Sequence, residues 1–109
     1  MPKKTPTTAL TINMLEGRGY LVDIVERRIP RANRTKDLFG FIDVLAIKGE
    51  ETLAVQVTDY SSVSKRIKKI ESDELADNVA RVRDANWRIE VHGWRKKGGE
   101  YVCRVIDLS

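Results

Sequence analysis

The stretch Leu38-Phe-Gly-Phe-Ile-Asp-Val-Leu-Ala-Ile47 is a nearly continuous apolar run that contains one carboxylate, Asp43. After turn residues at 49–50, a second run follows, Thr52-Leu-Ala-Val-Gln-Val-Thr58. Apolar runs of this length between turn residues are typical of buried strands. The two runs therefore predict a β-hairpin with both strands largely buried, in which Asp43 and Gln56 lie on adjacent strands.

The segment before this hairpin predicts a helix and a strand. Leu10, Met14 and Leu15 recur at helical spacing, so we expect a helix from a cap at Thr7 or Thr8 to about residue 18. Residues 20–29 are rich in β-branched side chains and end at a proline, which predicts a strand. The basic segment 30–36 is then expected to be a loop. We interpret residues 1–7 as a mobile leader and 8–109 as a single domain.

The segment after the hairpin predicts helices and a closing pair of strands. Val63, Ile67 and Ile70 fall on one face of a short amphipathic helix. Its outer face is basic, with Lys65, Arg66, Lys68 and Lys69. A capped, apolar-striped helix is expected over 72–85, followed by strands at 87–94 and 101–108.

This order of elements predicts an α/β domain with a mixed sheet. Three meandering strands pair antiparallel, and a right-handed helical crossover returns the next strand parallel to the sheet. A C-terminal hairpin strand completes the expected architecture.

The composition fits a soluble domain that can bind phosphates. Of 109 residues, 41% are hydrophobic and 33% charged, a balance that supports a packed core rather than a disordered chain. The formal net charge is +4, which permits nucleic-acid binding. Cys103 is the only cysteine, so no internal disulfide can form. With no apolar run of about 20 residues and no apolar signal core, we expect a cytoplasmic protein without a membrane partner.

Asp43 and the Gln56-Val57-Thr58 triplet, on the second and third predicted strands, resemble the signature of the PD-(D/E)XK nuclease superfamily. In that restriction-endonuclease-like superfamily, an aspartate begins strand two and a (D/E)-x-K triplet lies on strand three. Here Ile42 replaces the usual proline, and the triplet has no lysine. The context, including Arg88-Ile-Glu-Val-His-Gly-Trp-Arg95, looks like a branch of small phage-borne and bacterial members. The resemblance implies an αβββαβ core.

The resemblance also implies a set of site residues. Asp43 and Gln56 would be metal ligands for Mg²⁺ or Mn²⁺, held weakly because a neutral amide attracts a cation less than a carboxylate does. A second carboxylate would come from Glu26 or, alternatively, Glu16. Thr58 cannot supply the positive charge of the missing lysine. The nearest replacements by sequence are Lys65, which with Asp43, Gln56 and Thr58 makes up the expected catalytic set, and Lys36.

The expected nucleic-acid-binding residues are Lys36, Ser62, Lys65, Arg66, Lys68 and Lys69. An ordinary solvated face explains the basic helix about as well. Ser61 and Ser62 are expected to cap that helix more readily than to bind phosphate. His92 shares one strand face with Glu90 and Trp94, and we expect it to be partly exposed.

Three functions follow as hypotheses. The leading one is a Mg²⁺-dependent endonuclease, a hydrolase acting on DNA, whose activity is weak or lost. The second is a non-catalytic nucleic-acid-binding module of the same fold, because a fold does not dictate activity. The third is an interaction subunit that forms a homodimer through exposed edge strands.

Overall fold

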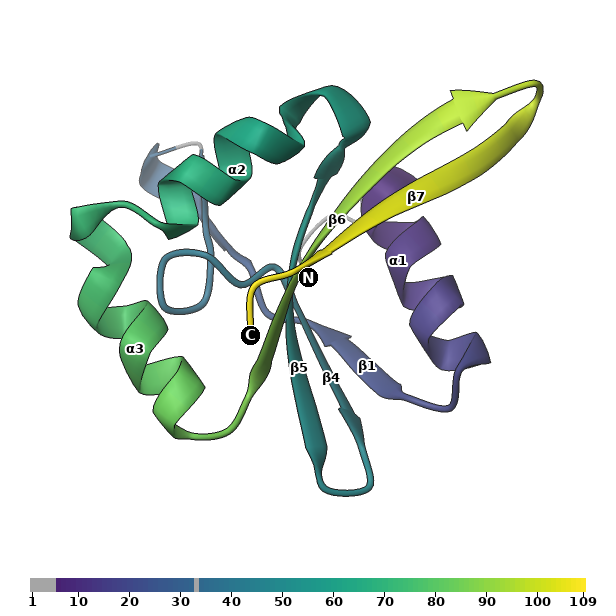
Figure 1. Cartoon of the computed structure of the whole chain (residues 1–109). Helices are drawn as coiled ribbons and strands as arrows, with labels where there is room; N and C mark the ends of the chain where they lie inside the picture. Colours follow the sequence, from purple (N-terminus) through teal and green to yellow (C-terminus); the bar gives the residue numbers. More distant parts are fainter. Residues whose placement is uncertain (1–5, 33) are drawn as a thin grey trace.

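The structure is a computed structural model that describes residues 6–32 and 34–109. A five-stranded sheet forms its centre, with one helix on one face and two helices on the other (Figure 1). In spatial order the strands are β1 (Leu21–Ile24), β4 (Val44–Lys48), β5 (Glu51–Asp59), β6 (Arg88–Lys97) and β7 (Glu100–Asp107). The helices are α1 (Pro6–Gly17), α2 (Val63–Ile70) and α3 (Ala76–Asp84).

The strand directions confirm the expected mixed sheet. β1, β4 and β5 pair antiparallel, β5 and β6 pair parallel, and β6 and β7 close the sheet as an antiparallel hairpin. The parallel pair is connected through α2 and α3, as a parallel connection requires a crossover. The α/β class and the position of the helical crossover therefore follow the sequence pattern.

Two hydrophobic cores lie on opposite faces of the sheet. On the α1 face, Leu15 packs with residues of β4, β5 and β6, among them Val44 and Val55. On the other face, side chains of α2 and α3 pack on Ala54 and Val91. Because side chains alternate along a strand, each β5 residue is assigned to one of the two faces. Leu53, Val55 and Val57 join the α1 core, so Gln56 and Thr58 project toward α2.

Helix α1 begins at Pro6, before the expected cap at Thr7 or Thr8. Proline is well tolerated at the start of a helix, where its missing N–H has no partner to lose. The expected leader 1–7 therefore overlaps the helix at its end, and residues 1–5 lie outside the described part of the chain. No helix in the described ranges is long and apolar enough to span a bilayer.

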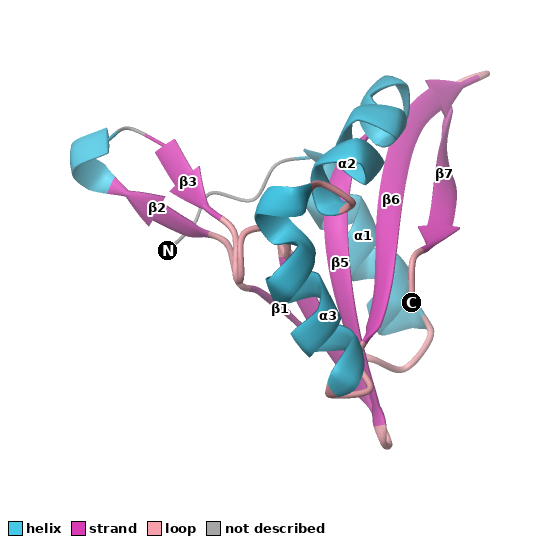
Figure 2. Cartoon of the chain, turned by 60° about the vertical axis from the view of Figure 1, so that its left-hand side comes forward, coloured by secondary structure: helices cyan, strands magenta, loops and turns pink. Residues whose placement is uncertain are grey.

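The strand predicted over 20–29 is divided into two, which corrects the sequence prediction. β1 ends at Ile24, and the N–H groups of Val25 and Glu26 turn to the backbone oxygen of Asp43, at 2.9 and 3.3 Å. The chain then forms β2 (Arg27–Ile29), a 3-10 turn η1 (Pro30–Ala32) and β3 (Arg34–Lys36). β2 and β3 make a separate two-stranded sheet that stands off the body of the molecule (Figure 2). The expected loop 30–36 is therefore part of a β-hairpin.

The apolar run at 38–47 is also only partly a strand. Leu38 and Ile42 exchange backbone hydrogen bonds of 2.9 and 3.0 Å, which close a tight loop before β4 starts at Val44. Gly40 makes this loop possible because its φ is +88° and a Cβ there would lie 2.7 Å from Leu75. Phe41 and Ile42 are apolar because the loop is buried under α2 and α3, a role that periodicity alone cannot distinguish from a strand.

The helices follow the predicted ranges with changes at their starts. A 3-10 turn, η2 (Tyr60–Ser62), precedes α2, and the carboxylate of Asp59 accepts bonds from the Ser62 N–H at 2.9 Å and the Ser61 hydroxyl at 3.2 Å. Asp59 thus caps η2, while Ser62 occupies the N-cap position of α2, as expected, but makes no side-chain cap bond there. The helix expected over 72–85 is a 3-10 turn, η3 (Asp73–Leu75), followed by α3.

Candidate metal and phosphate site

Asp43 lies at the entry to β4, where its backbone N–H donates to the Val55 oxygen at 2.9 Å. Its side chain, 7% exposed, points to the face that carries α2. There its Oδ2 accepts hydrogen bonds from the Gln56 Nε2, at 2.5 Å, and from the Val57 N–H, at 2.9 Å. The predicted meeting of Asp43 and Gln56 is therefore present in the structure, although Asp43 lies just before β4 rather than on a strand.

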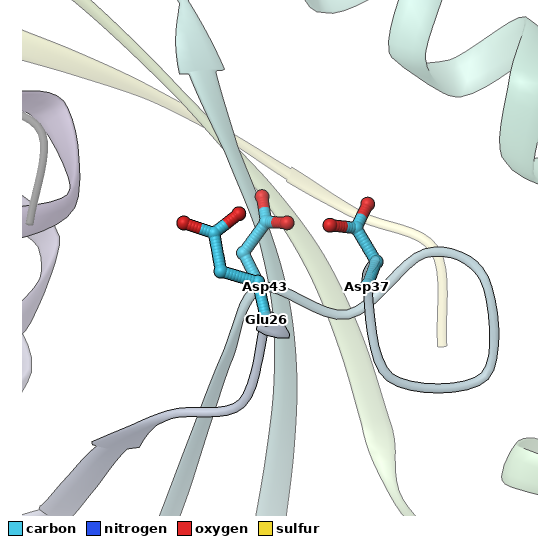
Figure 3. Close-up of side chains that lie close together, drawn as sticks. All are labelled: Glu26, Asp37 and Asp43. Carbon is cyan, nitrogen blue, oxygen red and sulfur yellow. The ribbon is translucent and has the colours of Figure 1, made fainter. Parts of the chain in front are cut away.

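Three carboxylates converge beside this hydrogen bond. Oxygens of Glu26, Asp37 and Asp43 lie within 4.8 Å of one another. Figure 3 shows the three side chains projecting in the same direction from three separate segments of the chain. Glu26 comes from the link between β1 and β2, Asp37 from the end of β3, and Asp43 from the loop before β4. Such a group can hold a metal ion.

Two of these three carboxylates are expected from the sequence. Glu26, the expected second acid, is present in the cluster, whereas its alternative, Glu16, is exposed on α1. Asp37 is the carboxylate that sequence reasoning misses. It reaches Asp43 because the Leu38–Ile42 bridge returns the chain on itself, which places the residues that flank the bridge side by side. The glycine within the apolar run is a signal for this arrangement, since Gly40 marks a turn rather than a strand.

The environment of the cluster opposes three negative charges. The pKa of Asp43 is raised to about 8, first by burial and then by the hydrogen bond and negative charge of Asp37. Burial, followed by the charge of Asp37, also raises the pKa of Glu26. Lys69 on α2 lies 3.7 Å from Asp37 and offsets part of this charge. A cation at the cluster would relieve the remaining repulsion.

Gln56 lines the cavity over the cluster and carries a buried side-chain oxygen. The residue is 2% exposed, and its Nε2 is used by Asp43, while its Oε1 is buried and has no hydrogen-bond partner among the described residues. A buried carbonyl oxygen without a partner is costly. Carboxylate and amide oxygens together form the donor set that Mg²⁺, Mn²⁺ or Ca²⁺ prefers. The side chains present therefore fit a hard divalent cation.

A cavity of about 900 Å³ opens over the cluster. Its cationic lining comes from two directions, with Arg34 and Lys36 on β3 and Arg66 and Lys69 on α2. Thr58, 7% exposed, also lines it and supplies no charge. The lining thus brings four basic side chains near the carboxylate cluster, together with two further acids, Asp59 and Glu74.

The structure separates the expected nucleic-acid-binding residues into two groups. Lys36, Arg66 and Lys69 line the cavity. Lys65, Lys68 and Ser62 are not among the described residues that line it. Of the two lysines expected to replace the triplet lysine, Lys36 is therefore at the cavity and Lys65 is not, because Lys65 projects from the exposed side of α2.

Arg66 is a candidate for the missing positive charge that sequence reasoning does not single out. Its Nε is buried and lacks a hydrogen-bond partner within the described part of the chain. A guanidinium is always charged and presents several donors to a phosphate. Arg66 therefore offers the site a positive charge from α2. Thr58, at the lysine position of the triplet, has no charge to offer.

His92 lies on the opposite face of the sheet, which corrects the expectation of partial exposure. It is fully buried, with its Nε2 at 2.9 Å from the Glu90 Oε1 and its Nδ1 at 3.3 Å from the Thr11 Oγ1. The Thr11 hydroxyl also accepts a bond of 2.8 Å from the Trp94 indole. These residues attach α1 to β6 and do not reach the carboxylate cluster.

Cys103 takes no part in the site. It is half-buried on β7, and burial raises the pKa of its thiol to about 11. The thiol is therefore protonated at neutral pH and behaves as a small apolar side chain.

Comparison of the chain with protein-family models, curated proteins and solved structures finds no match. The function is therefore inferred from the geometry of the site.

Proposed function

We propose that this protein is a metal-dependent nuclease that hydrolyses phosphodiester bonds in DNA. Mg²⁺ or Mn²⁺ would be held by Glu26, Asp37 and Asp43, with the Gln56 Oε1 as a fourth oxygen. The observation that carries the proposal is the convergence of three carboxylates within 4.8 Å in a cavity that four basic side chains also line. The carboxylates suit a cation, and the basic side chains suit the phosphate that the cation would activate.

The element order supports assignment to the restriction-endonuclease-like fold. A helix, an antiparallel set of strands, a helical crossover and a parallel strand occur here in that order. Asp43 and Gln56 occupy the places that the PD-(D/E)XK resemblance gives to the aspartate and the first residue of the triplet. The departure is Thr58, which stands where such a nuclease has lysine.

The chemistry divides between the cation and the protein. A divalent cation at the cluster would polarise the phosphodiester and stabilise the charge of the leaving oxygen. Arg66 on α2 and Lys36 on β3 would bind non-bridging phosphate oxygens and orient the phosphate over the carboxylates. Arg66 would thereby supply positive charge in place of the triplet lysine. Asp43, whose pKa is about 8 without a cation, would release its proton when a cation binds.

The experiment that tests this proposal compares Asp43→Asn with Asp84→Asn. The first keeps the size of the side chain and removes the charge at the cluster, and the second removes a carboxylate from the exposed end of α3. In Mg²⁺ or Mn²⁺, we expect Asp43→Asn to lower the rate of DNA cleavage by at least about 100-fold. Asp84→Asn should cleave like the parent. The proposal would be wrong if the parent and Asp43→Asn cleaved DNA at equal rates, or if the parent did not cleave DNA.

A non-catalytic DNA-binding module is the second candidate. The observation that favours it is the neutral pair Gln56 and Thr58, both buried, where active members of the resembled superfamily carry an acid and a lysine. It predicts DNA binding that weakens steeply with salt and no cleavage in any divalent cation.

A further inference from the structure

The β2–β3 hairpin, residues 27–36, concentrates positive charge beside the acidic cluster. Its basic residues are Arg27, Arg28, Arg31, Arg34 and Lys36, and the segment contains no acidic residue. All of its described residues are exposed except Ile29, which is half-buried. The hairpin therefore adds little to the hydrophobic core, and two-stranded sheets are marginally stable alone. Its main contribution to the surface of the protein is charge.

The register of the hairpin directs this charge toward the cavity. Arg27 pairs with Lys36, and Ile29 pairs with Arg34. Since side chains alternate along each strand, these four residues share one face. Ile29, Arg34 and Lys36 line the cavity, whereas the other face contributes only Thr35, so the face with three lining residues is the one turned mainly to the cavity. It places two cations, Arg27 and Lys36, directly opposite each other, an arrangement that destabilises a strand pair unless an anion lies against it.

Helix α2 supplies the other basic side chains of the cavity. Arg66 and Lys69 line the same cavity from α2, and the Lys69 Nζ lies 3.7 Å from the Asp37 carboxylate. Figure 2 shows the hairpin projecting beyond the sheet, so it can contact a long ligand that extends past the cavity. A chain of phosphates laid across the carboxylates would meet cations from both elements. A single small anion would use only one of them.

We propose that the β2–β3 hairpin is a substrate-binding arm that contacts the phosphate backbone of the nucleic acid and, with α2, holds it across the carboxylate cluster. This inference rests on the proposed function in one respect, that the ligand is a nucleic acid. It does not require that the protein cleaves that ligand. The arm binds through charge and without base contacts, so it contributes affinity and position rather than sequence preference.

The test compares two double variants of equal charge. Arg31→Gln/Arg34→Gln neutralises the arm, and Lys96→Gln/Lys97→Gln neutralises the exposed end of the β6–β7 hairpin. Binding of fluorescein-labelled single-stranded and duplex DNA is measured by anisotropy over a range of NaCl concentrations. These titrations contain Ca²⁺ in place of Mg²⁺, because Ca²⁺ also binds oxygen ligands and binding must be measured on intact DNA. Electrophoresis checks that the DNA stays intact.

For the arm variant we expect affinity to fall by about tenfold. The slope of log K against log salt should fall by about 1 for each phosphate that the arm no longer neutralises. The β6–β7 variant should bind like the parent, because charges beyond about 8 Å are largely screened at physiological salt. The arm variant should keep the parent's Mn²⁺ affinity and thermal midpoint. If its midpoint falls, Arg31→Gln alone tests the arm, since residue 31 lies in the 3-10 turn outside the paired strands.

Three results would overturn or separate the claims. Equal affinity and slope for the arm variant and the parent would overturn the arm, while Asp43-dependent cleavage would still uphold the proposed function. An arm effect on binding without any cleavage by the parent would uphold the arm and remove the nuclease activity. A parent chain that binds neither form of DNA would overturn both.

Discussion

The Asp43 carboxylate and the Gln56 amide are joined by a hydrogen bond of 2.5 Å that uses the nitrogen of the amide and leaves its oxygen buried and unpaired among the described residues. The bond fixes the amide, so Oε1 stays buried rather than free to rotate into solvent. In the proposed metal site, this buried oxygen is what lets a neutral residue act as a ligand.

Removing the Gln56 amide should weaken the metal site. We expect Gln56→Leu to lower Mn²⁺ affinity by about 10- to 100-fold, because it removes one oxygen ligand and the donor that orients Asp43. Mn²⁺ titration followed by electron paramagnetic resonance measures this change. A matched variant, Gln56→Glu, restores an oxygen with a charge and should bind Mn²⁺ at least as tightly as the parent. Parent-like affinity in Gln56→Leu would remove Gln56 from the site.

The raised pKa of Asp43 predicts a pH-dependent stability. Between its ordinary value of 3.8 and its folded value of about 8, the folded chain holds a proton that the unfolded chain releases. In EDTA the free energy of unfolding should therefore fall as pH rises through this window, by a few kcal/mol in total. Asp43→Asn should flatten the profile. Urea unfolding at several pH values measures it, and a parent profile that rises toward pH 8 would contradict the assignment.

Cation binding should oppose that loss of stability. Because the cation displaces the Asp43 proton, its affinity should increase with pH. Saturating Mg²⁺ should raise the thermal midpoint more at pH 8 than at pH 6, since binding to the folded state adds stability by mass action. An equal shift at both pH values would show that Asp43 does not release a proton to the cation.

Arg66 and Lys65 are adjacent on α2 but should differ in their effect on activity. Arg66 lines the cavity, and its Nε has no hydrogen-bond partner among residues 6–32 and 34–109, whereas Lys65 is exposed. Arg66→Gln should lower kcat/KM for DNA cleavage by about 100-fold, as expected for loss of a charged donor to a phosphate. Lys65→Gln should stay within about twofold of the parent. A larger loss in Lys65→Gln than in Arg66→Gln would favour Lys65, the replacement expected from the sequence.

Gly40 should be required to assemble the carboxylate cluster. Its φ is +88°, which strains any other residue, and a Cβ at this position would lie 2.7 Å from the Leu75 Cδ2, so the Leu75 side chain would have to shift. We expect Gly40→Ala to destabilise the fold by about 1–3 kcal/mol and to weaken Mn²⁺ binding through displacement of Asp37. Gly49→Ala, also at positive φ but with open space around it, is the control and should cost less. Urea unfolding and Mn²⁺ titration compare the two.

The sheet can be predicted well from the sequence, because the apolar pattern of each strand agrees with the strand pairing in the structure. The apolar runs and their turn place Asp43 and Gln56 on neighbouring strands, and a period of two places Gln56 and Thr58 on one face. The apolar stripe of α2 has helical spacing and predicts that helix where it is observed. These elements are decided by residues close in sequence.

The features that sequence reasoning misses depend on tertiary contacts. Asp37 joins the cluster only through the bridge that closes its loop, and the apolar residues of that loop match a strand pattern equally well. The β2–β3 hairpin has no alternating apolar face from which to predict it. His92 packs against Thr11, which is 81 residues away in sequence, so its environment could not be inferred locally.

The most direct test is an anomalous difference map from crystals of the chain grown with Mn²⁺. A peak within coordination distance of oxygens from Glu26, Asp37 and Asp43, with the Gln56 Oε1 turned toward it, is the predicted result. Mn²⁺ sites found only elsewhere, with the three carboxylates directed away from one another, would contradict the metal centre on which the proposed nuclease function depends.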